Sequence, residues 1–331
     1  MLLFKYLSPD AVHAVFGNVG VVSLKFGRPA TFNDPYELFL ETDQPLESDD
    51  QMAFYEHFCR DLPQLPVTCF SKYPHSVPMW AHYARDSKGI CLAFDEDTLV
   101  ESFPAAFIGD VSYSDQPAQV ASSMIKYAFA TGKRRHTVRL IAAVNRAVYF
   151  TKRSEWRYEG ERRMVVDDEA VIDCNGSLFG RVRNETLRYI ILGQNIEKSL
   201  GDFCNEHAVT TGIPLLSSCV GKRVYEPFFS QGDRCFRWNG SAFDQRAGRC
   251  RKCGDPNPVS PASLCKWCKI GEDVQENARA RSMLSATLHY GIDHGIPMGF
   301  EGLEPRGNAV DRAVPGRNAR NPDPLSQERD L

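Results

Sequence analysis

The sequence has no long hydrophobic run and no strong excess of charge of either sign. None of its apolar stretches approaches the roughly 18 residues that a membrane-spanning helix requires, which excludes a transmembrane protein. A net charge of −3 argues against a protein whose whole surface binds nucleic acid. Apolar residues make up 43% of the chain and charged residues 24%, as in ordinary globular proteins, so wholesale disorder, collagen and coiled-coil rods are not expected.

The start of the chain lacks the features of an export signal. Met1–Tyr6 runs directly into a strand-like segment, without a basic region followed by a long apolar one. We therefore predict a cytoplasmic protein that has no membrane partner. The chain has no internal repeats, and at about 100–200 residues per domain its 331 residues suggest two domains.

Cysteine is the residue that the sequence has in unusual number. Seven of the eleven cysteines are scattered singly, mostly in apolar surroundings: Cys59, Cys69, Cys91, Cys174, Cys204, Cys219 and Cys235. Cysteines in such settings usually act as small core residues in a reducing compartment. We expect these seven to be free thiols in the core.

The other four cysteines form two C-x2-C pairs separated by eleven residues, Cys250 with Cys253 and Cys265 with Cys268. Two such pairs present four thiolates that can surround one zinc ion in a tetrahedron. Two disulfides or a redox pair are the alternatives, but the odd cysteine total and the presence of two motifs disfavour them. The spacing predicts a structural zinc ribbon, and four cysteine ligands leave no open position for catalysis at the metal.

Charge is distributed unevenly along the chain. Residues 1–221 carry 22 basic and 28 acidic side chains, whereas residues 222–331 carry 17 basic and 14 acidic ones. The ribbon itself has six basic residues between 246 and 269, one acidic residue, Asp255, and the aromatic Trp267. Such a module can bind phosphates and stack on a base, or dock a protein. The alternative, that the charges only solubilise a very small module, remains open.

The pattern of apolar residues predicts an α+β fold, a mixed or split β-sheet with flanking helices. Strand-like runs lie at 2–6, 21–26, 67–71, 89–94, 106–113, 163–166 and 189–192, and helical patterns at 9–17, 50–60, 78–85, 120–149 and 195–208. Basic residues 133–136 suggest a hinge within the longest helix. We predict a main domain over 1–221, a connector with an Asn-Gly hairpin over 222–247, the zinc ribbon over 248–270, a helical segment over 271–300 and a disordered tail over 301–331.

Two stretches of the main domain are rich in residues that suit a binding pocket. Asn33 and Asp34 precede a proline in a turn signature, which equally describes an ordinary sharp loop. Ser71 ends a predicted strand, and Trp80, His82 and Tyr83 follow on a predicted helix. Aromatic residues at helical spacing are more often core than ligand contacts, so both interpretations stay open.

A third stretch carries two glutamates, Glu159 and Glu161. If a strand begins here, the two side chains point to one face, where they repel unless a cation, a ligand or water separates them. Nearby arginines allow a surface ladder of ion pairs as the alternative. The functional interpretation is an acid that orients a sugar hydroxyl or stabilises a developing positive charge.

Together these stretches resemble the bacterial domain-of-unknown-function family 2971. The resemblance rests on residues 4–6, 31–37, 69–71, 79–83 with Gly89, and 156–162, and covers about residues 1–200. The family name implies no activity. The zinc segment lies outside this span.

The order of motifs is also similar, more distantly, to ADP-ribosyltransferases, which bind NAD and cleave its nicotinamide–ribose bond. This resemblance implies that Lys5 or Tyr6 takes the first-strand position and Ser71 the second. Glu161 would then be the catalytic glutamate and Glu159 the residue that polarises the acceptor, with Trp80 or Tyr83 stacking on nicotinamide. The sequence departs from the pattern in having no first-strand Arg or His and no Ser-Thr-Ser run.

These expectations lead to one preferred function and two others. The preferred one is a cytoplasmic enzyme similar to ADP-ribosyltransferases, a toxin or phage-defence effector with NAD as substrate, directed to its target by the zinc ribbon. The alternative is a non-catalytic module whose Asn-Asp-Pro loop and aromatic helix bind a nucleotide, a nucleic acid or a protein. A nuclease ranks last, because the sequence lacks the His-Asn-His or clustered carboxylate site that such chemistry usually needs.

Overall fold

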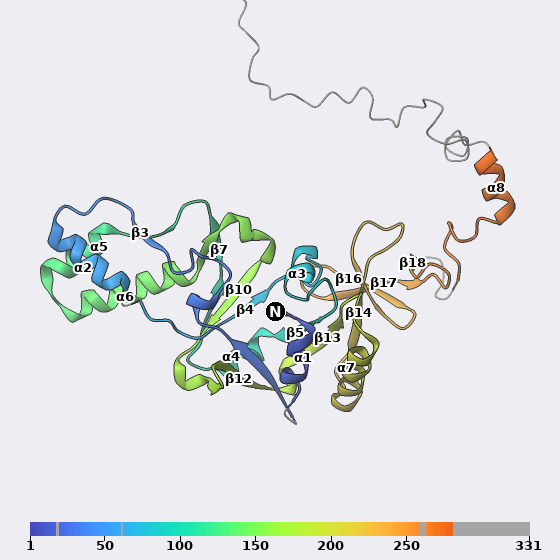
Figure 1. Ribbon diagram of the computed structural model, residues 1–331, viewed down its shortest axis with the longest axis horizontal. Helices are drawn as coiled ribbons and strands as arrows, with labels where there is room; N and C mark the ends of the chain where they lie inside the picture. Colours follow the sequence, from blue (N-terminus) through green and yellow to red (C-terminus); the bar gives the residue numbers. More distant parts are fainter. Residues whose placement is uncertain (18–19, 61, 258–262, 281–331) are drawn as a thin grey trace, which may run out of the picture. The chain divides into compact units, whose positions relative to one another are not determined.

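The computed structural model describes residues 1–17, 20–60, 62–257 and 263–280. The chain divides into two compact units, 1–269 and 270–331. In the first unit helices and β-sheets are mixed, which confirms the predicted α+β class (Figure 1). The described part of the second unit contains helix α8 (Glu272–Ala280). The rest of the predicted helical segment and the predicted tail over 301–331 lie outside the described residues.

The centre of the first unit is an eleven-stranded sheet. In spatial order its strands are β18 (Pro256–Asn257), β17 (Phe243–Arg249), β16 (Arg234–Trp238), β15 (Phe228–Gln231), β14 (Leu215–Cys219), β13 (Leu187–Leu192), β5 (Ile90–Asp95), β1 (Leu2–Leu7), β4 (Val67–Ser71), β10 (Glu161–Val165) and β6 (Phe107–Asp110). Its one parallel pair, β13 with β14, is connected through helix α7 (Lys198–Thr211), as parallel strands require.

Both faces of the sheet are buried near β5. Ile90, Leu92 and Phe94 belong to a core on one side, while Cys91 and Ala93 belong to a second core on the other. This is why the strand is an unbroken apolar run instead of an alternating one.

The first core lies under three helices and a small sheet. The helices are α1 (Pro9–Val15), α4 (Glu96–Ser102) and α7, and the small sheet has the order β11 (Ile172–Cys174), β12 (Ser177–Arg183), β2 (Val21–Phe26). Short 3-10 turns lie at Asp168–Ala170 and Asn184–Thr186. The second core is covered by α3 (Val77–His82) and is rich in aromatic side chains, among them Trp80, Phe229 and Phe243.

A third core fills the lobe at the left of Figure 1. It contains α2 (Asp49–Arg60), α5 (Ser122–Thr131), α6 (Arg134–Tyr149) and the two-stranded parallel sheet of β3 (Leu40–Thr42) and β8 (Ala118–Val120). A further parallel pair, β7 (Ser112–Ser114) with β9 (Thr151–Arg153), connects this lobe to the central sheet.

The long predicted helix at 120–149 is two helices, α5 and α6. Gly132 ends α5 with a φ of 57°, a left-handed conformation that glycine adopts readily, and its N–H closes the last turn on Ala128. The break therefore lies at residues 132–133, at the start of the predicted hinge. The basic residues expected to form the hinge begin α6.

The central sheet continues through residues 222–247, the predicted connector. β14, β15, β16 and β17 are consecutive neighbours in it. The Asn-Gly turn joins β16 to β17 as the sequence predicts, with Gly240 at a φ of 102° and the Asn239 Oδ1 atom accepting from the N–H groups of Ser241 and Ala242. Residues on either side of position 222 thus share one sheet.

One strand predicted from the sequence differs from the structure. The run predicted at 106–113 is two strands, because β6 pairs with β10 while β7 pairs with β9 in another sheet. All eleven cysteines are free. Of the seven scattered ones, Cys91, Cys204 and Cys235 are buried as predicted, whereas the prediction of a core position is wrong for Cys174, which is exposed. Among the described residues, no helix combines the length and the apolar character needed to cross a membrane.

Gly89 is a position where the fold leaves no room for a side chain. A Cβ atom there would lie 1.9 Å from the carbonyl oxygen of Leu7 on β1. We expect Gly89→Ala to lower the free energy of unfolding by about 1–3 kcal/mol or more, because the backbone must move apart. Urea unfolding measures this change.

Gly201 in α7 is the matched control for Gly89. A Cβ atom there meets no atom closer than Ile196 Cγ2 at 3.9 Å. Gly201→Ala should raise the free energy of unfolding by about 0.5–1 kcal/mol, because alanine costs less backbone entropy in a helix. Equal stability of the two variants would contradict the predicted packing at Gly89.

Candidate functional site

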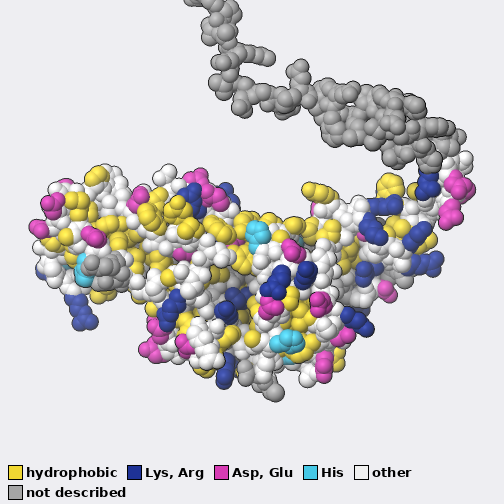
Figure 2. Space-filling model, viewed as in Figure 1, with side chains coloured by type: hydrophobic (Ala, Val, Ile, Leu, Met, Phe, Trp, Pro, Cys, Tyr) yellow, Lys and Arg dark blue, Asp and Glu magenta, His cyan; other side chains and the backbone are white. Residues whose placement is uncertain are grey.

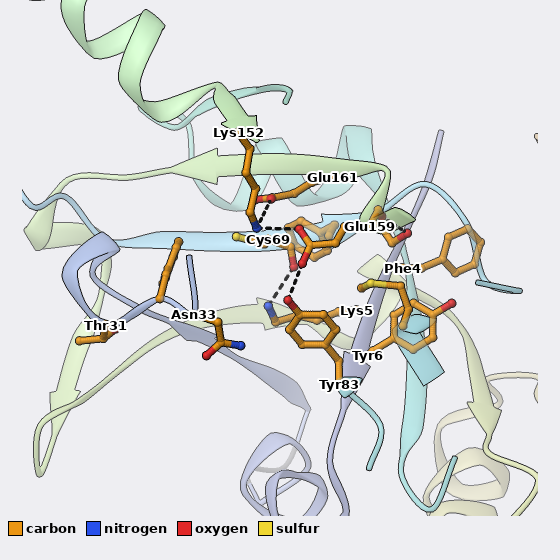
Figure 3. A pocket seen from close by; sticks show the side chains of 14 residues that line it. Phe4, Lys5, Tyr6, Thr31, Asn33, Cys69, Tyr83, Lys152, Glu159 and Glu161 are labelled. Carbon is orange, nitrogen blue, oxygen red and sulfur yellow. Dashed lines mark hydrogen bonds and ion pairs between the residues drawn. The ribbon is translucent and has the colours of Figure 1, made fainter. Parts of the chain in front are cut away.

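A cavity of about 230 Å³ opens between β1, β4, β10, the end of α3 and a loop that follows the 3-10 turn Pro29–Thr31 (Figure 3). Its lining consists of Phe4, Lys5, Tyr6, Thr31, Phe32, Asn33, Cys69, Phe70, Ser71, Met79, Tyr83, Lys152, Glu159 and Glu161. Seven of the ten catalytic and binding residues predicted from the sequence are among them: Lys5, Tyr6, Asn33, Ser71, Tyr83, Glu159 and Glu161.

Strand register brings three of these side chains onto one face. Phe4 on β1 is paired with Ser71 on β4, and Ser71 is paired in turn with Glu161 on β10. Directly paired residues of neighbouring antiparallel strands point to the same side of a sheet. The three positions therefore lie side by side, although the sequence separates the first from the last by more than 150 residues.

The two glutamates converge on one cation, Lys152 on β9. Its Nζ atom lies 2.7 Å from Glu159 Oε2 and 3.5 Å from Glu161 Oε2, and all three side chains are more than nine-tenths buried. Figure 3 shows the lysine reaching between the two carboxylates. A cation thus separates the pair, and the alternative of a surface ion-pair ladder is wrong because the cluster is buried.

The sequence pattern suggested that the two glutamates share a strand, but in the structure they lie on different elements. β10 begins at Glu161, while Glu159 ends the 3-10 helix Ser154–Glu159. Gly160 between them has a φ of 51°, and a Cβ atom there would lie 2.3 Å from the Tyr73 ring. The convergence of the carboxylates therefore depends on a left-handed turn at glycine and not on the alternation of a strand.

Arg163 holds Glu161 from the other side. This arginine is fully buried; its Nε atom donates to Glu161 Oε1 at 2.7 Å, and its two terminal nitrogens donate to the Glu37 carboxylate at 2.9 Å each. Nη1 also donates to the carbonyl of Tyr149 at 3.0 Å. Bidentate geometry of this kind gives a guanidinium–carboxylate pair strength and a fixed orientation.

The surroundings push the pKa values of the two glutamates in opposite directions. Burial alone would raise the pKa of the Glu161 carboxyl, but the charges of Arg163 and Lys152 outweigh it and bring the pKa to about 2. For Glu159, burial prevails and raises the pKa, helped by the charge of Glu161 and opposed by Lys152. Glu161 thus stays ionised over a wide pH range, whereas Glu159 is the stronger base.

Two further groups in the cavity have shifted protonation equilibria. Burial, followed by the charge of Glu159, raises the pKa of Tyr83, whose hydroxyl donates to Glu159 Oε1. Burial lowers the pKa of Lys5, whose Nζ atom donates to the Cys69 carbonyl at 3.1 Å. A cavity in which the pKa of one group is raised and the pKa of another is lowered is typical of functional sites.

Ser71 fastens the backbone that carries Glu159. Its hydroxyl, fully enclosed, donates to the Glu159 carbonyl at 2.6 Å and accepts from the Tyr73 N–H at 3.1 Å. Tyr6 also reaches this segment, because its hydroxyl donates to the Tyr73 carbonyl at 2.7 Å. Both residues therefore help to position the glutamates.

Three predicted binding residues do not line the cavity. Trp80 is buried against Tyr6 with ring centroids 5.1 Å apart, and its indole N–H donates to the Pro74 carbonyl at 2.9 Å. His82 contacts the Tyr158 hydroxyl at 3.2 Å. Asp34 is buried and accepts the Tyr36 N–H at 2.9 Å, which forms the turn before Glu37. Trp80 thus supports the cavity wall from behind through Tyr6, whereas His82 is exposed outside it.

Sequence reasoning did not assign a role to Lys152, Arg163 or Glu37. All three lie within or next to the motifs identified in the sequence, but nothing in the sequence pattern pairs Glu37 with an arginine 126 residues away. Tyr113, whose hydroxyl accepts the Glu161 N–H at 2.7 Å, was equally undetected. The signal for Lys152 and Arg163 was that two nearby carboxylates need a counter-charge.

A candidate metal centre lies at the other end of the central sheet. The sulfur atoms of Cys250, Cys253, Cys265 and Cys268 all lie within 4.8 Å of one another, and Cys253 Sγ is 3.8 Å from Cys265 Sγ. A tetrahedron with metal–sulfur bonds of about 2.3 Å has an edge of about 3.8 Å, so the spacing fits a bound metal ion.

Backbone geometry around the cysteines suits thiolate ligands. N–H groups of Cys253 and Cys265 are directed at the Cys250 sulfur and lower the pKa of that thiol to about 6. Gly254 has a φ of 82°, and its N–H donates to the Cys250 carbonyl at 2.9 Å, which closes the tight turn that the sequence predicts after the second cysteine.

Comparison with known proteins gives one match. The model of a family described as a protein of unknown function, DUF2971, matches residues 79–164. This span contains Tyr83, Lys152, Glu159, Glu161 and Arg163, and it supports the predicted family resemblance over a shorter stretch than residues 1–200. No curated protein and no solved structure matches the chain.

The opposite pKa shifts of the glutamates predict opposite effects of pH on stability. The depressed pKa of Glu161 contributes stability that is complete above its ordinary value of 4.5 and is lost as the pH falls towards 2. Between pH 4.5 and 2 the free energy of unfolding should therefore fall less in Glu161→Gln than in the wild type, by on the order of 2–3 kcal/mol.

Glu159→Gln provides the internal comparison. The raised pKa of Glu159 contributes stability at low pH that is lost as the pH rises above 4.5. Its replacement should remove this decline above pH 4.5 and leave the window below it almost unchanged. Urea unfolding at a series of pH values measures both effects. The assignment is wrong if the two variants alter the same pH window in the same direction.

Proposed function

We propose that the cavity binds the nicotinamide–ribose end of NAD and that the protein transfers ADP-ribose from it, as the resemblance to ADP-ribosyltransferases implies. The observation that carries the proposal is the convergence of Lys5, Ser71 and Glu161 from three adjacent strands, β1, β4 and β10, on one cavity. These are the positions that the resemblance assigns to NAD binding and catalysis. The match of the middle of this region to a family of unknown function is compatible with it and adds no activity.

The charge states of the glutamates suit the two roles that the reaction needs. When the bond between ribose C1′ and the nicotinamide nitrogen breaks, the bonding electron pair leaves with nicotinamide and positive charge develops on the ribose. An anionic Glu161 stabilises that charge in the transition state more than in the ground state. A nucleophile, water in the simplest case, then bonds to C1′ and gives its proton to Glu159, the stronger base.

The dimensions of the cavity suit one end of NAD. Its volume of about 230 Å³ is smaller than the roughly 300–1,000 Å³ of pockets that enclose whole drug-sized ligands, so the adenosine half would lie outside. Aromatic side chains of Phe4, Phe32, Phe70 and Tyr83 provide apolar surface for the nicotinamide ring. Trp80 is not available for stacking, because it lies behind the cavity wall.

A second candidate function is binding without catalysis. Arg163 and Lys152 already neutralise Glu161, and Lys152 and Tyr83 already satisfy Glu159, so the cluster is stable without a ligand. Such a network also suits a rigid pocket that holds a nucleotide or a segment of a protein partner. The two functions differ in whether NAD is consumed.

For the metal centre we propose a structural zinc ion. Four thiolates at tetrahedral spacing favour zinc among the common metals, and they leave no coordination position for a substrate. The free state of all eleven cysteines supports the proposal that the protein works in a reducing compartment, the cytoplasm.

Loss of the Glu161 charge tests the enzyme proposal. Purified protein incubated with NAD should release nicotinamide, and Glu161→Gln should lower that rate by about 10²–10⁴-fold, because the developing positive charge loses its counter-ion. Chromatography of nicotinamide measures the rate. A thermal melt of each variant separates loss of chemistry from loss of fold.

Glu155→Gln is the matched control for this experiment. Glu155 lies on the same 3-10 helix as Glu159 but is exposed and paired with Arg153, so its variant should retain wild-type turnover. Wild-type turnover by a folded Glu161→Gln variant would overturn the catalytic assignment. Binding of NAD by the wild type without any release of nicotinamide would favour the binding module.

The zinc proposal predicts metal content directly. The purified chain should contain about one zinc ion, and Cys253→Ser together with Cys268→Ser should abolish it, because two thiolates cannot hold the ion tightly. Cys174→Ser, at an exposed single cysteine, should leave the metal content unchanged. Elemental analysis by mass spectrometry measures all three. A metal-free wild type with a folded segment over 248–269 would show that no metal is required there.

A further inference from the structure

The metal-binding segment presents a surface that the proposed reaction does not use. Its described part consists of residues 222–226, before β15, and of residues 249–257 and 263–269, around the four cysteines. Asp255 joins them, because its buried carboxylate accepts the N–H groups of Lys222 and Arg223 at 3.0 Å each. Neighbouring charges from the two stretches are therefore held together.

This surface is strongly basic. Lys222, Arg223, Arg251, Lys252, Lys266 and Lys269 all have exposed side chains. Asp255 is the only acidic residue between 246 and 269, and its oxygens are used by backbone N–H groups; Glu226 is paired with Arg237 at 2.7 Å. Figure 2 shows Lys and Arg side chains gathered around β17 and β18. Over the residues that the structure describes, the basic surface thus carries a net positive charge.

An aromatic ring is exposed in the middle of these charges. Trp267 lies between the last two cysteines of the cluster and is 48% exposed. The guanidinium of Arg223 lies 5.1 Å from the centre of its ring and the ammonium of Lys266 5.7 Å from it. The metal-binding turn fixes the backbone of the tryptophan, and so an exposed flat ring is held next to cations.

From this arrangement we infer that the basic surface binds single-stranded nucleic acid. Unpaired bases stack on exposed aromatic rings, and lysine and arginine neutralise the phosphates between them. In a duplex the faces of the bases are stacked on one another, so a duplex would bind this surface through its phosphates alone. An acidic protein would likewise be held by charge and would leave the exposed ring without a role. The site is independent of the proposed NAD chemistry, because binding can be measured without turnover.

Fluorescence anisotropy with a labelled oligothymidine tests the inference on the full-length protein. Trp267→Ala should weaken binding by about 5- to 150-fold, the effect of losing one stacked base. A variant that combines R251A, K252A, K266A and K269A should weaken it further. That variant should also reduce the slope of log affinity against log salt concentration by up to about three, for four lost phosphate contacts.

A second set of arginines provides the matched control. Arg134, Arg135, Arg139 and Arg146 are exposed on α6, in the lobe at the other end of the first unit, so replacing all four with alanine removes the same charge. This control should bind the oligothymidine as the wild type does. Zinc content of every variant verifies that the metal-binding segment is intact.

The alternatives give distinct results. Equal affinity for a duplex of the same length, or unchanged affinity of Trp267→Ala with metal retained, would overturn the stacking role and reduce the site to non-specific charge. Equal losses in the α6 control and the four-charge variant would show that the basic surface is not the site. Nicotinamide release is measured in parallel, so a failure of this inference cannot be confused with a failure of the proposed enzyme.

Discussion

The guanidinium of Arg163 is fully buried and joins its own strand to a helix end and to a loop 126 residues away. It donates to Glu161 on its own strand, to Glu37 from the loop beside the cavity and to the carbonyl of Tyr149 at the end of α6. Removing one partner of such a buried pair typically costs about 3–5 kcal/mol, because the remaining charge stays desolvated. The cavity loop, the helical lobe and β10 are therefore mutually constrained.

The sequence was sufficient to identify the cavity residues that come from conspicuous motifs, such as Ser71 at the end of β4 and Glu161 at the start of β10. The hydrophobic pattern predicted strands at 67–71 and 163–166, and the resemblance to ADP-ribosyltransferases placed Ser71 and Glu161 in one site. The sequence did not indicate which charges meet, because the contact between Glu37 and Arg163 depends on strand order across the sheet. Trp80 shows the opposite error: spacing placed an aromatic residue on the correct helix, but burial decided that it faces the core and not the cavity.

The relation between the metal centre and the main domain also depended on long-range pairing. Composition changes near residue 222, and this change suggested a boundary. The backbone nevertheless continues from β14 into β15, β16 and β17, so the hydrogen-bonded ladder passes through the change in charge without interruption. Side-chain composition reflects the environment of the protein surface, whereas strand pairing depends on backbone groups that every residue carries. The cavity and the metal centre are accordingly built on one sheet, with the cavity at β1, β4 and β10 and the cysteines beyond β17.

Gly160 gives the two glutamates a more demanding sequence signature than a Glu-x-Glu pattern. The left-handed turn and the Tyr73 ring against it leave no room for a side chain at the middle position. A chain with any other residue between the carboxylates would have to place them by a different backbone path, even if both acids were retained. Distant relatives with the same cluster should therefore be sought by Glu-Gly-Glu followed by an arginine two positions later. In this pattern the glycine, which has no reactive side chain, is the most informative residue.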